Sequence, residues 1–125
     1  MKLPQQPHVL IIEDDPVLRI LLEDWLDREG FLVDEAGDDP AALKLVKRLP
    51  FDILLTDLHL PPPMDGLEVV RRAKEGHPEL RSLFMSGTAP PTRGNPDLDD
   101  FISKPLNKTQ LIGCVFELLC RGGSR

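Results

Sequence analysis

The sequence has little of the material that membrane-spanning or exported proteins need. None of its apolar runs approaches the roughly 20 residues of a membrane-spanning helix. The first residues, Met1 to Pro7, lack the charged and then apolar layout of a signal peptide. We therefore expect neither membrane association nor export, and we predict a cytoplasmic location.

Cysteine is scarce as well. Cys114 and Cys120 fall in one predicted helix, where six residues span about 9 Å along the helix axis. That distance is too long for a disulfide bond between them. We therefore predict reduced, partly buried thiols in a reducing compartment.

Basic residues are too few for a surface that binds nucleic acid. Lysine and arginine number 15 against 21 acidic residues, so the formal net charge is -6. Proteins that bind nucleic acid usually show a basic face, and we expect no direct binding. A chain of 125 residues with 41% hydrophobic content predicts one folded domain. We expect it to cover residues 1–125, with flexible ends at 1–7 and 121–125.

Short apolar runs alternate with amphipathic helices along the chain. The pattern predicts strands over residues 8–13, 31–35, 52–56, 81–85 and 100–103. The predicted helices have Asp15, Asp39 and Asn107 as N-caps, and a further helix covers 67–74. This alternation is typical of an α/β fold with a parallel sheet. Five strands favour a flavodoxin-like, doubly wound sheet of order 2-1-3-4-5.

Polar side chains follow these strands at their carboxyl ends: Glu13 and Asp14, then Asp57, Ser86 and Lys104. In this topology the strand ends meet at one edge of the sheet, where ligands bind. The three carboxylates would repel one another without a cation between them, and their oxygens suit Mg²⁺. A carboxylate such as that of Asp57 can be phosphorylated directly, with Lys104 and the Ser86 hydroxyl holding phosphoryl oxygens.

Five segments of the chain resemble the receiver domains of bacterial two-component response regulators. They cover nearly the whole chain in the family's order: VLIIEDDPVLR (Val9 to Arg19), DILLTDLHLP (Asp52 to Pro61), MDGLE (Met64 to Glu68), FMSG (Phe84 to Gly87) and FISKP (Phe101 to Pro105). The resemblance implies that Asp57 is the phosphoacceptor, with a sensor histidine kinase or a histidine phosphotransfer protein as the donor.

The same resemblance implies a role for each site residue. Asp14, Asp57 and the backbone carbonyl of His59 would bind Mg²⁺, with Mn²⁺ as an alternative, and Glu13 would orient the metal. Lys104 would pair with Asp57 and contact the phosphoryl group. Two residues would act as the switch, namely Ser86 and Phe101. A shift of one residue in the first strand would put Asp15 in place of Glu13.

Two regions depart from the family pattern. The loop after Asp57 carries one extra residue, so Pro62 or Pro63 is expected to bulge it. The segment between Ser86 and Lys104 is short and rich in proline, which costs about 3 kcal/mol inside a helix. The fourth helix of the family is therefore expected to be shortened, irregular or missing, and the usual output surface to differ.

The last predicted helix is apolar on more than one side, at Leu111, Ile112, Cys114, Val115, Phe116, Leu118, Leu119 and Cys120. A helix of that kind is usually buried on several faces, so we predict an exposed patch that pairs with a partner or in a homodimer.

The leading interpretation is a stand-alone regulator that catalyses only its own phosphorylation and dephosphorylation. After Leu119 only Cys120 to Arg125 remain, so we expect it to act on a downstream protein target and not through a DNA-binding domain. One alternative is an interaction module that works without phosphorylation. Another is an aspartyl-phosphate hydrolase, which the histidine at position 59 disfavours, because such enzymes usually carry a second acid there.

Overall fold

The computed structural model describes residues 6–60, 65–87 and 100–123, which contain five strands and four helices. They are β1 (His8–Ile12), α1 (Pro16–Arg28), β2 (Leu32–Ala36), α2 (Asp39–Arg48), β3 (Ile53–Asp57), α3 (Gly66–Gly76), β4 (Arg81–Ser86), β5 (Asp100–Ser103) and α4 (Lys108–Gly123). All strand pairs are parallel, in the order β2-β1-β3-β4-β5. The predicted fold class and strand order are confirmed.

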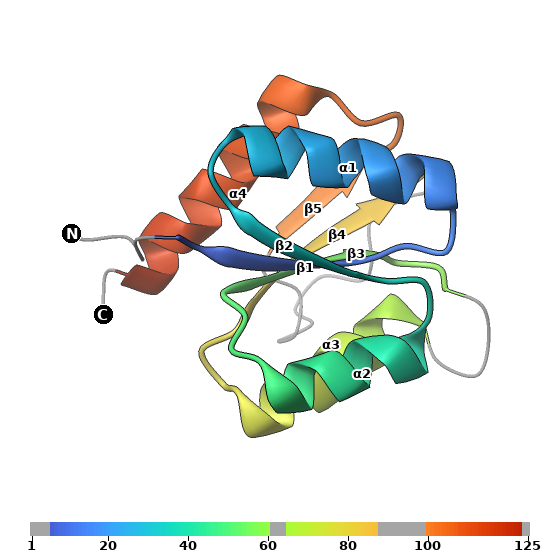
Figure 1. Cartoon of the computed structure of the whole chain (residues 1–125), viewed down its shortest axis with the longest axis vertical. Coiled ribbons are helices and arrows are strands. Elements are labelled where there is room, and N and C mark those ends of the chain that lie inside the picture. The colour runs from blue at the N-terminus through green and yellow to red at the C-terminus, as the bar shows by residue number, and fades with distance from the viewer. Residues whose placement is uncertain (1–5, 61–64, 88–99, 124–125) are drawn as a thin grey trace.

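Helices cover both faces of the sheet (Figure 1). Alternate residues of each strand point to opposite faces, so Val9 and Ile11 pack with α1 and α4, whereas Leu10 and Ile12 pack with α2 and α3. Residues 9–12 are fully buried, as expected of a central strand in a parallel sheet. The two hydrophobic cores lie on the faces of the sheet, so polar side chains can gather at its carboxyl edge.

The predicted helix caps are confirmed at two positions and wrong at a third. Asp15 accepts a hydrogen bond from the backbone of Val17, and Asn107 accepts one from Gln110. At α2 the N-cap is Asp38, not Asp39. Asp39 is the first helical residue and is buried. Proline is tolerated at either of the first helical positions, so the Asp-Asp-Pro sequence fits both assignments.

Helix α1 turns part of its apolar surface outward. Leu22 and Leu26 are fully buried, but Leu21 is 42% exposed. Val17 is 75% and Ile20 63% exposed. An apolar face therefore remains on this helix, beside the turn that carries Asp14.

Helix α4 buries four of the eight apolar residues predicted for it, namely Leu111, Val115, Leu118 and Leu119. Phe116 remains 37% exposed, and its ring centroid lies 5.3 Å from that of Phe31. Cys114 is half-buried and Cys120 is exposed, and both are free thiols. The predicted apolar patch is thus small on the described part of this helix, and its pairing stays a prediction.

Some expectations fall on residues outside the described ranges. The fourth helix of the family would lie within 88–99, and the prolines expected to bulge the loop, Pro62 and Pro63, lie within 61–64. Among the described residues, no helix has the length and apolar character needed to cross a membrane. The cytoplasmic location stays a prediction.

Candidate functional site

The carboxyl ends of the three central strands lie level with one another. The register pairs Ile12 with Thr56 and Asp57 with Met85. The sequence pattern placed Asp57 directly after the strand, but in the structure Asp57 is the last residue of β3. Its side chain therefore starts from a rigid strand, at the same edge at which β1 ends.

Three acidic side chains gather at this edge. Glu13, Asp14 and Asp57 each offer a carboxylate oxygen, and these atoms lie within 4.8 Å of one another. Glu13 is fully buried and Asp57 is 7% exposed, whereas Asp14 lies at the exposed rim. We call these three residues the acid cluster. Sequence reasoning selected all three.

Lys104 brings a positive charge to the acid cluster. Its Nζ donates to Asp57 Oδ2 at 2.7 Å and to Glu13 Oε1 at 3.1 Å. Burial works to lower the pKa of Lys104, but the hydrogen bonds to Asp57 and Glu13 outweigh it, and its pKa lies above the usual value. The lysine is therefore a fixed cation, tied to strands that are far apart in the sequence.

The charge of Glu13 is only partly compensated. Burial is the main reason that the pKa of Glu13 rises to about 7, although the hydrogen bond from Lys104 acts to lower it. Among the described residues, Glu13 Oε2 is buried without a hydrogen-bond partner. Within the described ranges, three carboxylates formally face one ammonium group, that of Lys104. An unpaired buried anion is costly. A divalent cation with oxygen ligands, such as Mg²⁺, fits this donor set.

The carboxylate of Asp57 is held at both oxygens. The backbone N–H of His59 donates to Oδ1 at 2.9 Å, while Lys104 donates to Oδ2. The Thr56 hydroxyl donates to the Asp57 carbonyl at 3.0 Å. Strand and loop together thus fix the orientation of the carboxylate. The metal contact predicted for the His59 carbonyl stays a prediction.

The start of α3 lies against the backbone of Asp57. A Cβ atom placed on Gly66 would lie 2.3 Å from the Asp57 carbonyl oxygen. The Gly66 N–H donates to the Leu58 carbonyl at 3.0 Å. Only glycine permits this approach, because a real Cβ atom would collide with backbone that cannot move away easily. The sequence predicted only a helix over 67–74, which begins directly after this glycine.

The two predicted switch residues are not members of the acid cluster. Ser86 is buried at the end of β4, where its carbonyl accepts a hydrogen bond from the Lys104 backbone at 2.8 Å. Phe101 is half-buried and packs on the core beneath α2 and α3. Asp15, the alternative to Glu13, is exposed and caps α1.

Sequence reasoning gave no role to Arg19 of α1. Its guanidinium Nη1 donates to the Glu13 carbonyl at 2.7 Å, and its Nε pairs with Glu35 at 3.1 Å. Arg19 ends the first of the segments that resemble the family. Arg19 follows Asp15 by four residues, so the two lie one helical turn apart on the same side of the helix. That spacing could have indicated that the long arginine side chain can contact the end of β1.

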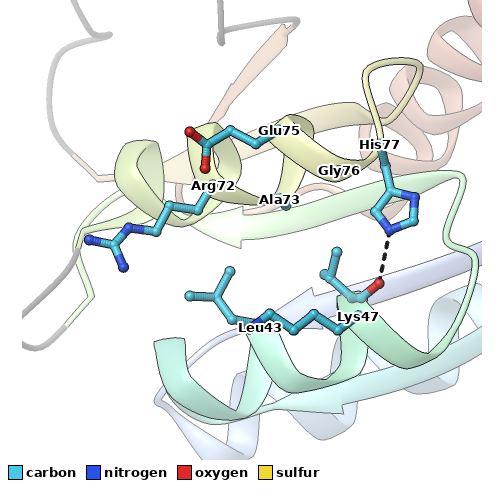
Figure 2. Close-up of a pocket in the computed structure, with 8 residues that line it drawn as sticks. Leu43, Lys47, Arg72, Ala73, Glu75, Gly76 and His77 are labelled. Atoms are coloured by element: carbon cyan, nitrogen blue, oxygen red, sulfur yellow. Dashed lines mark hydrogen bonds between the residues drawn. The ribbon is translucent and has the colours of Figure 1, made fainter.

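A cavity of about 330 Å³ lies between α2 and α3 (Figure 2). Val46 and Ala73 contribute to its apolar lining, and the His77 ring is hydrogen-bonded to the Val46 carbonyl. Its lining includes none of the residues predicted for the site. The chemistry of the acid cluster therefore does not involve this cavity.

The sheet order and the acid cluster at its carboxyl edge define a receiver-type signalling domain. Residues 9–116 match the family described as "Response regulator receiver domain". The response regulator receiver protein CpdR of Brucella abortus is 34% identical over 117 residues, which cover 90% of this chain and 96% of that protein. The chain belongs to the response regulator receiver domain family.

Solved structures agree with this assignment. A response regulator receiver protein from Sinorhizobium medicae is 29% identical, with a TM-score of 0.85 and coverage of 94% of this chain and 98% of that one. The response regulator TrrA of Thermotoga maritima, solved in complex with Mg²⁺ and BeF, is 25% identical with a TM-score of 0.80. That match covers 91% of this chain and 100% of the TrrA chain.

Relatives differ in their overall length. The chain spans nearly all of CpdR but about half or less of several other curated relatives. The receiver domain family to which the chain belongs is a signalling switch and not an enzyme of the classical kind.

Proposed function

We propose that this protein is a phosphoaccepting response regulator in which Asp57 takes a phosphoryl group from a phosphohistidine. The observation that carries the proposal is the carboxylate of Asp57, held at Oδ1 by the His59 N–H and at Oδ2 by Lys104, beside Glu13 and Asp14. A nucleophile that is already held in one orientation loses less entropy when it attacks.

The reaction transfers one group. An Asp57 carboxylate oxygen attacks the phosphorus, an O–P bond forms, the P–N bond to the donor imidazole breaks, and the imidazole leaves with the bonding electron pair. Lys104 neutralises charge on the phosphoryl oxygens. The Ser86 hydroxyl, at the end of β4, is the second group proposed to contact them. The product is an acyl phosphate on Asp57.

Asp14, Asp57 and the carbonyl of His59 are the proposed ligands of Mg²⁺ or Mn²⁺, with Glu13 orienting the ion. Two features of the described residues support this assignment: Glu13 Oε2 has no hydrogen-bond partner among them, and the acid cluster has a surplus of negative charge. The bound ion would neutralise phosphoryl oxygens during transfer. The magnesium complex of TrrA, at 25% identity, is a further support.

The apolar face of α1, formed by Val17, Ile20 and Leu21, is the proposed docking surface for the phosphodonor protein. The helix begins directly after Asp14 and Asp15, so this face lies next to the acid cluster. A protein that delivers a phosphohistidine to Asp57 has to lie against this rim. A sensor histidine kinase or a histidine phosphotransfer protein fits that role.

Phosphorylation would change contacts with a downstream protein target. Ser86 and Phe101 are the residues proposed to move: the Ser86 carbonyl accepts a hydrogen bond from the Lys104 backbone, and Phe101 lies on β5, the strand that ends just before Lys104. Direct binding to nucleic acid or membranes is not part of the proposal, and we place the reaction in the cytoplasm. A homodimer through α4 is one form that the output contact could take.

The test is incubation with acetyl phosphate and Mg²⁺, followed by mass measurement of the intact protein. Wild-type protein should gain the mass of one phosphoryl group, and the Asp57→Asn variant should not. No gain in the wild type, together with no binding of beryllofluoride, would favour an interaction module that works without phosphorylation. Equal gain in both proteins would remove Asp57 as the acceptor.

A further inference from the structure

Arg19 links three parts of the chain at the start of α1. Its Nη1 donates to the Glu13 carbonyl at 2.7 Å and its Nε pairs with Glu35 Oε1 at 3.1 Å. Its backbone N–H donates to the Asp15 carbonyl at 3.0 Å. The side chains of Arg19 and Glu35 are only 24% and 25% exposed. This pair is therefore screened less by water than an ordinary surface ion pair.

The carbonyl that Arg19 holds belongs to the peptide between Glu13 and Asp14. Strand β1 ends at Ile12, and one further backbone hydrogen bond to β2 follows, from the Glu13 N–H to the Ala36 carbonyl at 3.1 Å. At this end of the strand the side chain of Glu13 is buried, and that of Asp14 lies at the exposed rim. This one peptide joins the two residues that supply two of the three carboxylates of the acid cluster.

Gly37 leaves the space that the arginine uses. A Cβ atom on Gly37 would lie 3.1 Å from Nη1 of Arg19 and 3.7 Å from its Cζ. The guanidinium thus lies between Gly37, Glu35 and the Glu13 carbonyl, close to the end of β2. A planar guanidinium can make these two directed contacts at once, whereas a lysine ammonium cannot reproduce the same fork.

We propose that Arg19 is a positioning residue that fixes the peptide between Glu13 and Asp14 and so sets the geometry of the acid cluster. The inference rests on the proposed function, because it concerns the same divalent cation. Arg19 touches no cluster carboxylate itself and acts through the backbone. Groups that orient metal ligands in this way typically affect metal affinity 10-fold to 100-fold, so loss of Arg19 should weaken cation binding without removing a ligand.

The test compares Arg19→Ala with Arg28→Ala, which removes an arginine ion pair from the exposed side of the same helix. Mn²⁺ affinity is measured by the electron paramagnetic resonance signal of the free ion, on proteins shown to be folded by circular dichroism. Arg19→Ala should raise the dissociation constant at least about tenfold. Arg28→Ala should leave it within about twofold of wild type, because Arg28 lies away from the β1 end.

A second measurement separates positioning from general stability. The Mg²⁺ concentration for half-maximal phosphorylation by acetyl phosphate should rise in Arg19→Ala, while the rate at saturating Mg²⁺ returns close to that of wild type. For Arg19→Lys, this half-maximal Mg²⁺ concentration should lie between the values for wild type and Arg19→Ala. The lysine variant replaces the alanine variant if the latter does not fold. A folded Arg19 variant with wild-type Mn²⁺ affinity would overturn the inference. Wild-type protein that binds no Mn²⁺ would overturn the proposed function instead.

Discussion

Lys104 lies 2.7 Å from Asp57 and 3.1 Å from Glu13, and so joins the chain after β5 to the ends of β1 and β3. One ammonium group thereby compensates two carboxylates that are almost entirely buried. Its removal would leave both acids without their cation, which costs more than the loss of an exposed ion pair.

The Lys104→Met variant should accordingly be less stable than wild type in EDTA. We expect a loss of about 1 to 3 kcal/mol in the free energy of unfolding, because Lys104 is 27% exposed and water screens part of the interaction. Urea unfolding measures it, with the exposed Lys108→Met as the matched control. Added Mg²⁺ should recover part of the loss. Equal urea midpoints for the two variants would contradict the assigned role of Lys104.

Gly66→Ala tests the close approach of α3 to the phosphoacceptor strand. The new methyl group would lie 2.3 Å from the Asp57 carbonyl oxygen, so the backbone of Asp57 or α3 has to shift. Such overpacking typically costs about 1 to 3 kcal/mol, and phosphorylation by acetyl phosphate should slow as well.

The control for this variant is Gly76→Ala at the other end of α3. A Cβ atom there has no neighbour within 4 Å. Alanine should therefore leave stability unchanged or raise it slightly, since alanine favours helix more than glycine does. Thermal unfolding of the two variants compares the effects directly, and similar destabilisation at both positions would argue against a special role for Gly66.

The sequence was sufficient for those parts of the site that depend on strand order. Once the sheet order is set, the residues at the strand ends must converge, and Glu13, Asp14, Asp57 and Lys104 do converge. The role of Arg19 was not predictable in the same way. It depends on where a long side chain ends relative to Glu35 and Gly37, which lie on a different strand and loop.

Helix faces were predictable only in part, for a similar reason. In α1 the adjacent Leu21 and Leu22 both fit an apolar stripe, yet only Leu22 reaches the core. The width of the stripe depends on how the helix is rotated on the sheet, and the spacing alone does not determine that rotation. The start of α2 was ambiguous for another reason: proline is tolerated at either of the first two helical positions, so Asp38 and Asp39 both fitted the N-cap before Pro40.

The buried carboxyl of Glu13 predicts a pH dependence of stability in the absence of metal. Its pKa rises to about 7 in the folded protein from a usual 4.5, mainly through burial. An acid with a raised folded pKa favours the folded state when protonated. Its contribution to stability therefore falls as the pH rises from the lower to the higher value.

Glu13→Gln should remove this contribution. In EDTA the melting temperature of the variant minus that of wild type should increase from about pH 5 to about pH 8. The reason is that the amide has no proton to lose, whereas Glu13 does. Differential scanning calorimetry at the two pH values measures the change. The same variant should bind Mn²⁺ more weakly. A difference in melting temperature that is independent of pH would show that Glu13 does not titrate in this range.

Ile20 is the residue of choice for testing the docking face on α1. It is 63% exposed and lies between Val17 and Leu21 on the apolar surface, so Ile20→Ser removes contact area without opening the core. The donor is a histidine phosphotransfer domain that has been phosphorylated on histidine with phosphoramidate. Transfer from this protein should slow about tenfold, which corresponds to a contact of about 1.4 kcal/mol.

Phosphorylation by acetyl phosphate supplies the internal reference, because a small donor needs no docking face. The Ile20→Ser variant should react with acetyl phosphate at the wild-type rate, and so should Leu49→Ser, which alters an exposed apolar residue at the end of α2. Slower reaction with both donors would place the effect of Ile20 at the acid cluster. Unchanged transfer from the protein donor would mean that the phosphohistidine approaches Asp57 from a side that leaves α1 uncovered.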